Sequence, residues 1–169
     1  MRRQALSITL VLATVVLALA TAASGAPARN ACTAGESTIG GVKYETFCGP
    51  AKASVKTGGK TLTFTNGACV TTSSYFTINV GATQLLATGK PVKAYFGLDV
   101  GKVPGGEEFG GRAAGGDGTY ANVPVSFVSS TGTKYLALGA TVKLTNGRKD
   151  GSFSGKLLTG GSASGTFSC

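Results

Sequence analysis

The sequence predicts an all-β protein, an antiparallel sandwich or barrel of eight to ten short strands, cross-linked by disulfides and preceded by an N-terminal signal helix. Apolar and polar residues alternate over many short runs, as they do in strands with one buried face. Glycine pairs separate the runs, and 27 of the 169 residues are glycine while none is tryptophan. This composition suits strands and tight turns better than helices. Four cysteines supply the cross-links.

Residues 1–26 have the three parts of a secretory signal peptide. Arg2 and Arg3 form the basic start, Leu6–Ala20 is the apolar stretch, and small residues follow it. An uncleaved membrane anchor is one alternative, because the uncharged run 4–28 is long enough to span a bilayer. Acylation of Cys32 is another, although no leucine stands three residues before it.

Four cysteines remain after the leader, and an even number in an exported chain predicts two disulfides. Three pairings are possible, and we favour Cys32–Cys48 with Cys69–Cys169. The first closes the N-terminal segment, residues 27–50. The second ties the last strand, in which Cys169 falls on the apolar face, to an early strand. A metal site is the rival interpretation, but the chain has no Cys-x-x-Cys and no histidine.

Residues 51–169 are predicted to form the antiparallel domain. Its alternation is clearest over residues 133–145, where one face carries Leu136, Leu138, Ala140, Val142 and Leu144. Hairpin turns are predicted at Gly58-Gly59, Asn66-Gly67, Asn146-Gly147 and Gly160-Gly161. The alternation stops between residues 101 and 118, where eight of eighteen residues are glycine. That segment is predicted to be a long flexible loop.

The absence of histidine narrows the chemistry. It removes the Ser-His-Asp and Cys-His arrangements and the commonest metal ligand. Glu107, Glu108 and Asp117 in the glycine-rich loop suggest a calcium site, with a solvated acidic loop as the alternative. The run Gly116–Ala121 matches a dinucleotide-binding pattern, yet it enters a strand where that pattern needs a helix. We expect no enzymatic activity, no metal and no cofactor.

The net charge of +9 suggests an anionic partner. Lys52, Lys56 and Lys60 lie along the hairpin 51–65, and Arg148 and Lys149 adjoin the Asn146-Gly147 turn. These five residues are candidates for binding an anionic cell-wall polymer or lipid headgroups. The alternative is that lysines keep the protein soluble and protect strand edges.

The tyrosines offer a second candidate surface. Nucleic acid is not expected as a partner, because the chain is predicted to be exported and its tyrosines do not cluster with basic residues. Exposed tyrosines would instead form a sugar-binding face. The five tyrosines are Tyr44, Tyr75, Tyr95, Tyr120 and Tyr135.

The layout of the domain resembles a known family. A strand and glycine hairpin are followed by a cysteine after Asn66-Gly67, by the run Tyr75–Gly81, and by the ending Gly165–Cys169. These features resemble the mycobacterial 19 kDa lipoprotein antigen family of actinobacterial surface proteins, over residues 51–169. The resemblance implies a non-enzymatic cell-envelope protein with Cys69 bonded to Cys169. The family is lipid-anchored through a lipobox, which Cys32 here lacks.

Together these observations predict an exported, non-enzymatic protein of the cell envelope or the extracellular medium, with a structural or binding role. The alternative is a carbohydrate- or wall-polymer-binding module that uses the basic hairpin or the tyrosines. Anchoring to the membrane is not favoured. The oligomeric state and the ligand stay open at this point.

Overall fold

A computed structural model describes residues 32–84 and 93–169, which belong to one compact unit. The predicted signal peptide, residues 1–26, lies outside the described residues, as do residues 27–31 of the predicted N-terminal segment. Every regular element in the described part of the chain is a strand. The strands are β1 (Gly35–Ile39), β2 (Val42–Thr46), β3 (Ala51–Thr57), β4 (Lys60–Thr71), β5 (Tyr75–Gln84), β6 (Tyr95–Lys102), β7 (Glu108–Phe109), β8 (Gly118–Val128), β9 (Lys134–Thr145), β10 (Asp150–Lys156) and β11 (Ser162–Ser168).

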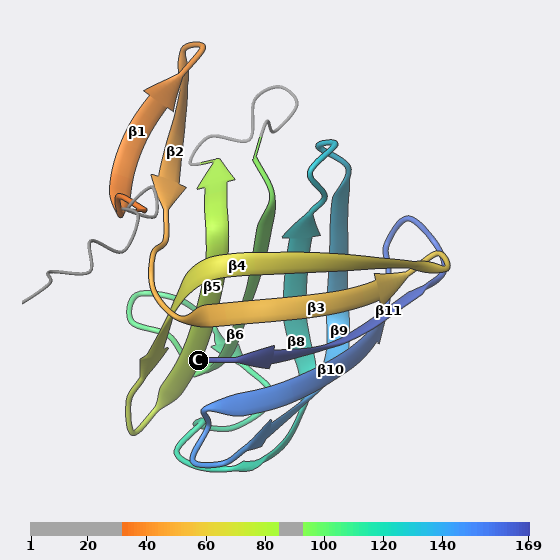
Figure 1. Cartoon of the computed structure of the whole chain (residues 1–169). Coiled ribbons are helices and arrows are strands. Elements are labelled where there is room, and N and C mark those ends of the chain that lie inside the picture. The colour runs from red at the N-terminus through yellow and green to blue at the C-terminus, as the bar shows by residue number, and fades with distance from the viewer. Residues whose placement is uncertain (1–31, 85–92) are drawn as a thin grey trace, which may run out of the picture. The chain divides into compact units, whose positions relative to one another are not determined.

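Eight of these strands close into an antiparallel barrel, so the predicted fold class is confirmed. β3, β4, β5, β6, β8, β9, β10 and β11 each pair with the next in chain order, and β11 returns to pair with β3. Figure 1 shows β3, β4, β10 and β11 crossing in front of β5, β6, β8 and β9. Closure leaves the eight strands without a free edge along their paired lengths.

Three further strands lie outside the barrel wall and raise the count above the predicted eight to ten. β1 and β2 form a hairpin whose turn, Gly40-Gly41, has positive φ angles that glycine adopts without strain. β2 pairs with the end of β5, where Tyr44 lies opposite Gln84. The two-residue strand β7 pairs with the end of β6.

Phenylalanine rings fill the middle of the barrel. Phe96 is fully buried, and its ring centroid lies 5.9 Å from that of Phe64, 5.6 Å from Phe153 and 6.5 Å from Phe167. Aromatic pairs at such separations add to the stabilisation that area burial provides. The interior is therefore a packed core and the candidate sites lie on its outside.

Two glycines make room for two of these rings. Gly151 lies opposite Phe167 in the β10–β11 pairing, and Gly165 lies opposite Phe153. A Cβ atom on Gly151 would collide with the Phe167 ring and would lie 2.8 Å from the carbonyl oxygen of Lys143. Each strand therefore carries the pattern Gly-x-Phe, and antiparallel pairing places each ring over the partner strand's glycine.

The predicted hairpin turn at Asn66-Gly67 is wrong. β4 runs through these residues to Thr71, and Asn66 has a φ of 65° within the strand. Near this position the pairing with β3 shifts register, and from Gly67 onward β4 pairs with β5. An asparagine in the left-handed region thus makes a bulge that redirects the strand. The chain turns later, where the Thr72 hydroxyl accepts hydrogen bonds from the amides of Ser74 and Tyr75.

The alternation predicted for residues 133–145 is also broken by a bulge. Ala137 pairs with Val125 and Ala140 with Val123, so two residues of β9 oppose one of β8. Ala137 is buried, whereas Leu138 is 55% exposed. The inward face predicted from Ala140 to Leu144 is correct, and the predicted inward positions of Leu136 and Leu138 are not.

The predicted loop 101–118 contains more structure than its composition indicates. Its first two residues complete β6, Glu108–Phe109 forms β7, and the side chain of Ala114 is fully buried. The Ala114 amide donates to the Ser74 carbonyl at 2.9 Å. Glycine is needed at position 101, where φ is 87° and an added Cβ would lie 2.6 Å from the Ala114 nitrogen.

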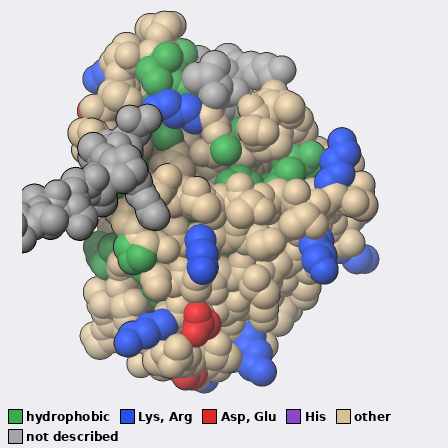
Figure 2. All heavy atoms as spheres, in the orientation of Figure 1, with side chains coloured by type: hydrophobic (Ala, Val, Ile, Leu, Met, Phe, Trp, Pro, Cys, Tyr) green, Lys and Arg blue, Asp and Glu red, His purple; other side chains and the backbone are tan. Residues whose placement is uncertain are grey.

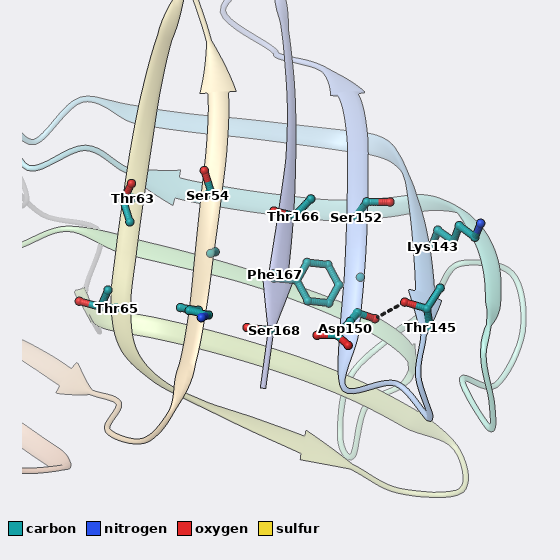
Figure 3. A pocket seen from close by; sticks show the side chains of 13 residues that line it. Ser54, Thr63, Thr65, Lys143, Thr145, Asp150, Ser152, Thr166, Phe167 and Ser168 are labelled. Atoms are coloured by element: carbon teal, nitrogen blue, oxygen red, sulfur yellow. Dashed lines mark hydrogen bonds between the residues drawn. The ribbon is translucent and has the colours of Figure 1, made fainter.

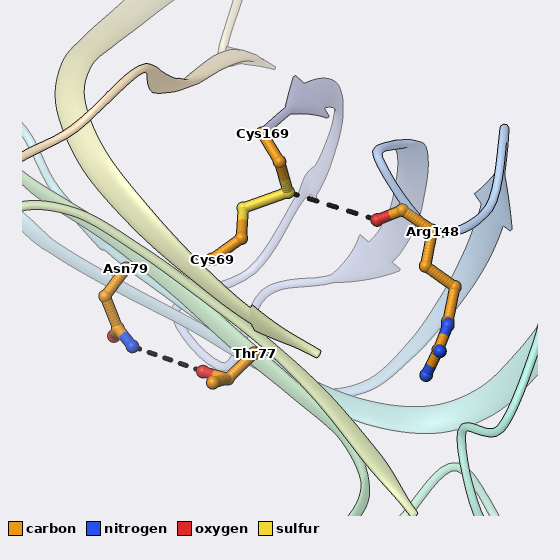
Figure 4. The surroundings of a disulfide bond; sticks show 5 residues. All are labelled: Cys69, Thr77, Asn79, Arg148 and Cys169. Carbon is orange, nitrogen blue, oxygen red and sulfur yellow. Dashed lines mark hydrogen bonds between the residues drawn. A yellow bond between two sulfur atoms is a disulfide. The ribbon is translucent and has the colours of Figure 1, made fainter. Parts of the chain in front are cut away.

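The favoured disulfide pairing is the one in the structure. Cys69 bonds to Cys169 (Figure 4) and Cys32 bonds to Cys48, which leaves no free cysteine. Such bonds persist in a non-reducing environment. The sulfur of Cys32 is used in a disulfide, so the alternative of a thioether-linked lipid at this residue does not fit the fold. Within residues 32–84 and 93–169, no helix has the length and hydropathy needed to cross a membrane.

Candidate functional site

A shallow groove of about 530 Å³ crosses the outer face of the barrel over β4, β3, β11, β10 and β9. Figure 2 shows this face covered mainly by uncharged side chains and backbone, with separate Lys or Arg side chains and a few acidic ones among them. The outward positions of these strands carry small hydroxyl side chains because the inward positions hold the core residues, and the two sets alternate. We call this surface the hydroxyl groove.

The register of the sheet aligns the hydroxyls into rows. Ser54 lies opposite Thr63 on one side and Thr166 on the other, Thr166 opposite Ser152, and Ser152 opposite Lys143. This row runs over five neighbouring strands, as Figure 3 shows. Strands are about 4.8 Å apart, so the row is about 20 Å long.

A second row lies beside the first. Lys52 is opposite Ser168, Ser168 opposite Asp150, and Asp150 opposite Thr145. The Thr145 hydroxyl donates to the backbone carbonyl of Asp150 at 3.3 Å. The groove therefore presents several hydroxyl groups, two lysines (Lys52 on β3 and Lys143 on β9) and one carboxylate, that of Asp150 on β10, which accepts a hydrogen bond from Asn146 at 2.7 Å.

The four lysines among the five predicted basic residues have exposed side chains. Lys52, Lys56 and Lys60 are exposed, and all three line grooves on the outer surface. Lys149 is exposed beside the β9–β10 turn. Lys143 also lines the hydroxyl groove, although the sequence reasoning did not single it out. Its outward position in the alternation of 140–144 was the signal that could have identified it.

Arg148, one of the five predicted polymer-binding residues, makes hydrogen bonds within the fold through its side chain. Its guanidinium Nη1 donates to the carbonyl oxygens of Thr72, at 2.6 Å, and Ala114, at 2.5 Å. Its carbonyl oxygen lies 3.9 Å from Cys169 Sγ (Figure 4). The side chain therefore links the β9–β10 turn to two other loops at this end of the barrel.

The acidic residues of the predicted calcium site are not brought together as ligands. Both carboxylate oxygens of Asp117 accept backbone hydrogen bonds, from Gly147 at 3.0 Å and Arg148 at 2.7 Å. Glu107 and Glu108 have exposed side chains in and beside β7. Within the described part of the chain, no group of three or more His, Cys, Asp or Glu residues is placed to hold a metal ion.

The tyrosines do not form the exposed sugar-binding face that the sequence suggested. Tyr44 and Tyr120 are buried, and the other three are half-buried. Tyr135 stacks on Phe127 with ring centroids 4.7 Å apart. Tyr95 lies over Gly97, and its hydroxyl donates to Asn79 Oδ1 at 2.5 Å.

Tyr95 is also electrostatically perturbed. Burial raises the pKa of its hydroxyl well above the ordinary tyrosine value, and the negative charge of Asp99 adds to this effect. A hydrogen bond with Ser126 acts in the opposite direction, and Glu45 adds a smaller increase. The hydroxyl therefore stays protonated at physiological pH and serves as a hydrogen-bond donor in the barrel wall.

The fold and the groove define a disulfide-bonded, eight-stranded antiparallel barrel with a filled core and a hydroxyl-lined outer face. Comparison of the chain with protein-family models, with curated proteins and with solved structures finds no match.

Proposed function

We propose that this protein is an exported, non-enzymatic component of the cell envelope that binds an anionic polysaccharide through the hydroxyl groove. The observation that carries the proposal is the pair of adjacent rows of outward hydroxyls in the groove, with Lys143 at the end of the first row and Lys52 at the end of the second. Hydroxyls exchange hydrogen bonds with sugar hydroxyls, and the two lysines complement carboxylate or phosphate groups along a polymer.

Several features support the predicted location and the absence of catalysis. The leader-like residues 1–26 and the two disulfides favour a place outside the cytoplasm. The resemblance to the lipoprotein antigen family favours the cell envelope. The chain contains no histidine, so the general base that most hydrolases use is missing. A polymer-binding role requires no reactive group.

The proposal is tested by titrating the protein with polygalacturonate, a polyanionic polysaccharide, and with neutral dextran as the reference. We expect saturable binding to polygalacturonate at low salt. This binding should weaken as salt is raised to about 0.3 M, because dissolved ions then screen the attraction between charges that are more than a few ångströms apart. The paired substitution Lys52→Gln/Lys143→Gln removes about 1 kcal/mol per lysine and lowers affinity by about thirtyfold.

A matched control has the same change in net charge at lysines outside the groove. Lys43→Gln/Lys102→Gln leaves the groove intact and is expected to retain most of the affinity, since both residues are exposed on β2 and β6. Thr166→Val keeps the volume and removes one hydroxyl, so it tests the hydrogen-bonding part and should cost about fivefold. Equal losses in the two lysine pairs, or no binding at low salt, would overturn the proposal.

A further inference from the structure

A second groove, of about 430 Å³, lies at the end of the barrel where β5, β6, β8 and β9 come together with the β10–β11 turn. It differs from the hydroxyl groove because most of its described lining is apolar. The contributing side chains include Tyr95, Val128, Leu136 and Leu158, with Lys134 at the rim. Its volume is within the range of small-ligand sites.

The register places these side chains on the outer side of the sheet. Tyr95 lies opposite Val128, and Val128 opposite Lys134, while Ser126 lies opposite Leu136. The residues between them along the strands, such as Phe127, are buried in the core. The leucine at position 136 is therefore directed away from the core.

Exposed leucines extend this apolar surface. Leu158 is 64% exposed, and its amide donates to the carbonyl of Leu136 at 2.9 Å, which places the β10–β11 turn beside β9. Leu138, two residues along β9 from Leu136, is 55% exposed because of the bulge. Clustered exposed leucines on a small protein mark a binding surface more often than isolated ones do.

Positive and negative charges are distributed unevenly around the groove. Lys134 is exposed and lies at the β9 end of the row Tyr95–Val128–Lys134. Tyr95 is at the opposite end of this row, and the negative charges of Asp99 and Glu45 act on its hydroxyl. The residues described as lining the groove include no carboxylate. An anionic group is therefore favoured at Lys134 and disfavoured beside Tyr95.

We propose that this groove binds a free long-chain carboxylate, with the acyl chain over Leu136, Leu158 and Val128 and the carboxylate at Lys134. The combination of one apolar channel and one cation at its end complements a single-chain anionic amphiphile. The groove is concave, with the Tyr95 ring on one side, which Phe47 contacts at a centroid distance of 6.3 Å, and the β10–β11 turn on the other. A single chain fits such a site better than a bilayer surface does.

The experiment uses the full mature protein with both disulfides intact and measures binding of dodecanoate below its micellar concentration by calorimetry. Dodecanol and dodecylammonium serve as neutral and cationic probes with the same chain. We expect dodecanoate to bind with one site per chain, dodecanol about fivefold more weakly, and dodecylammonium at least tenfold more weakly, because only the carboxylate pairs with Lys134.

Two substitutions separate the parts of the site. Lys134→Gln should remove the fivefold preference for dodecanoate over dodecanol and leave dodecanol binding unchanged. Leu158→Gln should weaken the binding of dodecanoate and of dodecanol by about tenfold, since it removes the apolar contacts that the bound chain would bury. Ile39→Gln is the control, because Ile39 is an aliphatic residue of β1 that is also exposed, at 42%. The near-ultraviolet circular dichroism of each variant reports that it has folded.

Four outcomes would overturn the proposal. These are no saturable binding of dodecanoate, equal affinity for all three head groups, binding to phosphatidylglycerol vesicles without binding of free dodecanoate, and a dimer in sedimentation that Leu158→Gln dissociates. The last two would assign the surface to a membrane or to a second copy. None of these measurements depends on polysaccharide binding, and Lys52→Gln/Lys143→Gln should leave dodecanoate binding intact.

Discussion

At the level of single residues, two Gly-x-Phe patterns determine how the C-terminal half of the barrel packs. Gly151 and Gly165 lie under the rings of Phe167 and Phe153, so glycine is required there for space. The sequence places a phenylalanine two residues after each glycine, but the fact that each ring covers the other strand's glycine depends on register.

Gly151→Ala tests this packing. The added methyl group collides with the Phe167 ring and with the backbone of Lys143, so we expect a loss of about 1–3 kcal/mol in the free energy of unfolding. Gly116→Ala is the matched control, because a Cβ at Gly116 meets no heavy atom within 4 Å. Urea denaturation measures both variants. A neutral Gly151→Ala would mean that the rings have more freedom than the structure shows.

Tyr95 gives a prediction of pH dependence. The folded protein holds the Tyr95 pKa above its unfolded value of about 10, so the folded state keeps a proton that the unfolded state releases. The stabilisation from this residue is complete below about pH 10 and is lost as pH rises through the folded-state pKa. Stability measured from pH 8 to 11 should therefore fall more steeply in the wild type than in Tyr95→Phe.

The Tyr95→Phe variant should also be less stable than the wild type at neutral pH. Tyr95→Phe removes the hydrogen bond to Asn79, so it should lower stability by about 1 kcal/mol at pH 7. The two stability curves should therefore converge toward alkaline pH. Parallel curves would contradict the assignment of the raised pKa to Tyr95.

At the level of elements, the segment between β6 and β8 is held by hydrogen bonds that its composition does not suggest. Arg148 donates to the Ala114 and Thr72 carbonyls, and Asp117 accepts from the turn that carries Arg148. A loop and a turn about thirty residues apart in sequence are thereby fastened to each other. The pattern of apolar and polar residues indicates alternation within one segment, but it does not predict hydrogen bonds between segments that are distant in sequence.

Arg148→Met tests this connection. The substitution keeps most of the aliphatic stem and removes two charge-assisted hydrogen bonds, so it should lower stability by about 2 kcal/mol. It should also expose residues 103–117 to limited proteolysis. Lys149→Met is the control because Lys149 is exposed next to it. If both variants are cleaved at the same rate as the wild type, Arg148 does not fasten the loop.

The bulges act at this same level. Asn66-Gly67 is a common turn signal, yet β4 continues through it because its two halves pair with different neighbours. Leu138 fits an alternating pattern, yet the bulge in β9 directs it outward. In both cases one residue of offset decides which face a side chain occupies, and the offset depends on the partner strand.

At the level of the whole molecule, the last strand closes the barrel. β11 pairs with β10 and with β3, and Cys169 after it is bonded to Cys69 on β4. The disulfide joins residues 100 positions apart, whereas Cys32–Cys48 spans 16 and ties the segment before the barrel. The two bonds should therefore contribute unequally to stability.

Removing each disulfide separately tests this difference. In the chain-entropy model the longer loop corresponds to about 4.7 kcal/mol and the shorter to about 3 kcal/mol. We expect Cys69→Ala/Cys169→Ala to lower the urea midpoint more than Cys32→Ala/Cys48→Ala does. The second pair serves as the matched control for loss of a disulfide. The reverse order would show that the N-terminal hairpin, and not the closing strand, limits barrel stability.

The sequence by itself determined the all-β class and three of the four predicted hairpin turns, because these follow from local alternation and from glycine. The cysteine count predicted two disulfides and left three pairings, of which the structure contains the one we favoured. The tertiary structure alone decided closure between β3 and β11, the outward position of Leu138 and the engagement of Arg148. It also brought Lys143, Ser152, Thr166 and Ser54 into one row. Those features depend on which strands become neighbours and in what register, and long-range pairing is set by the energy of the whole barrel rather than by any one segment.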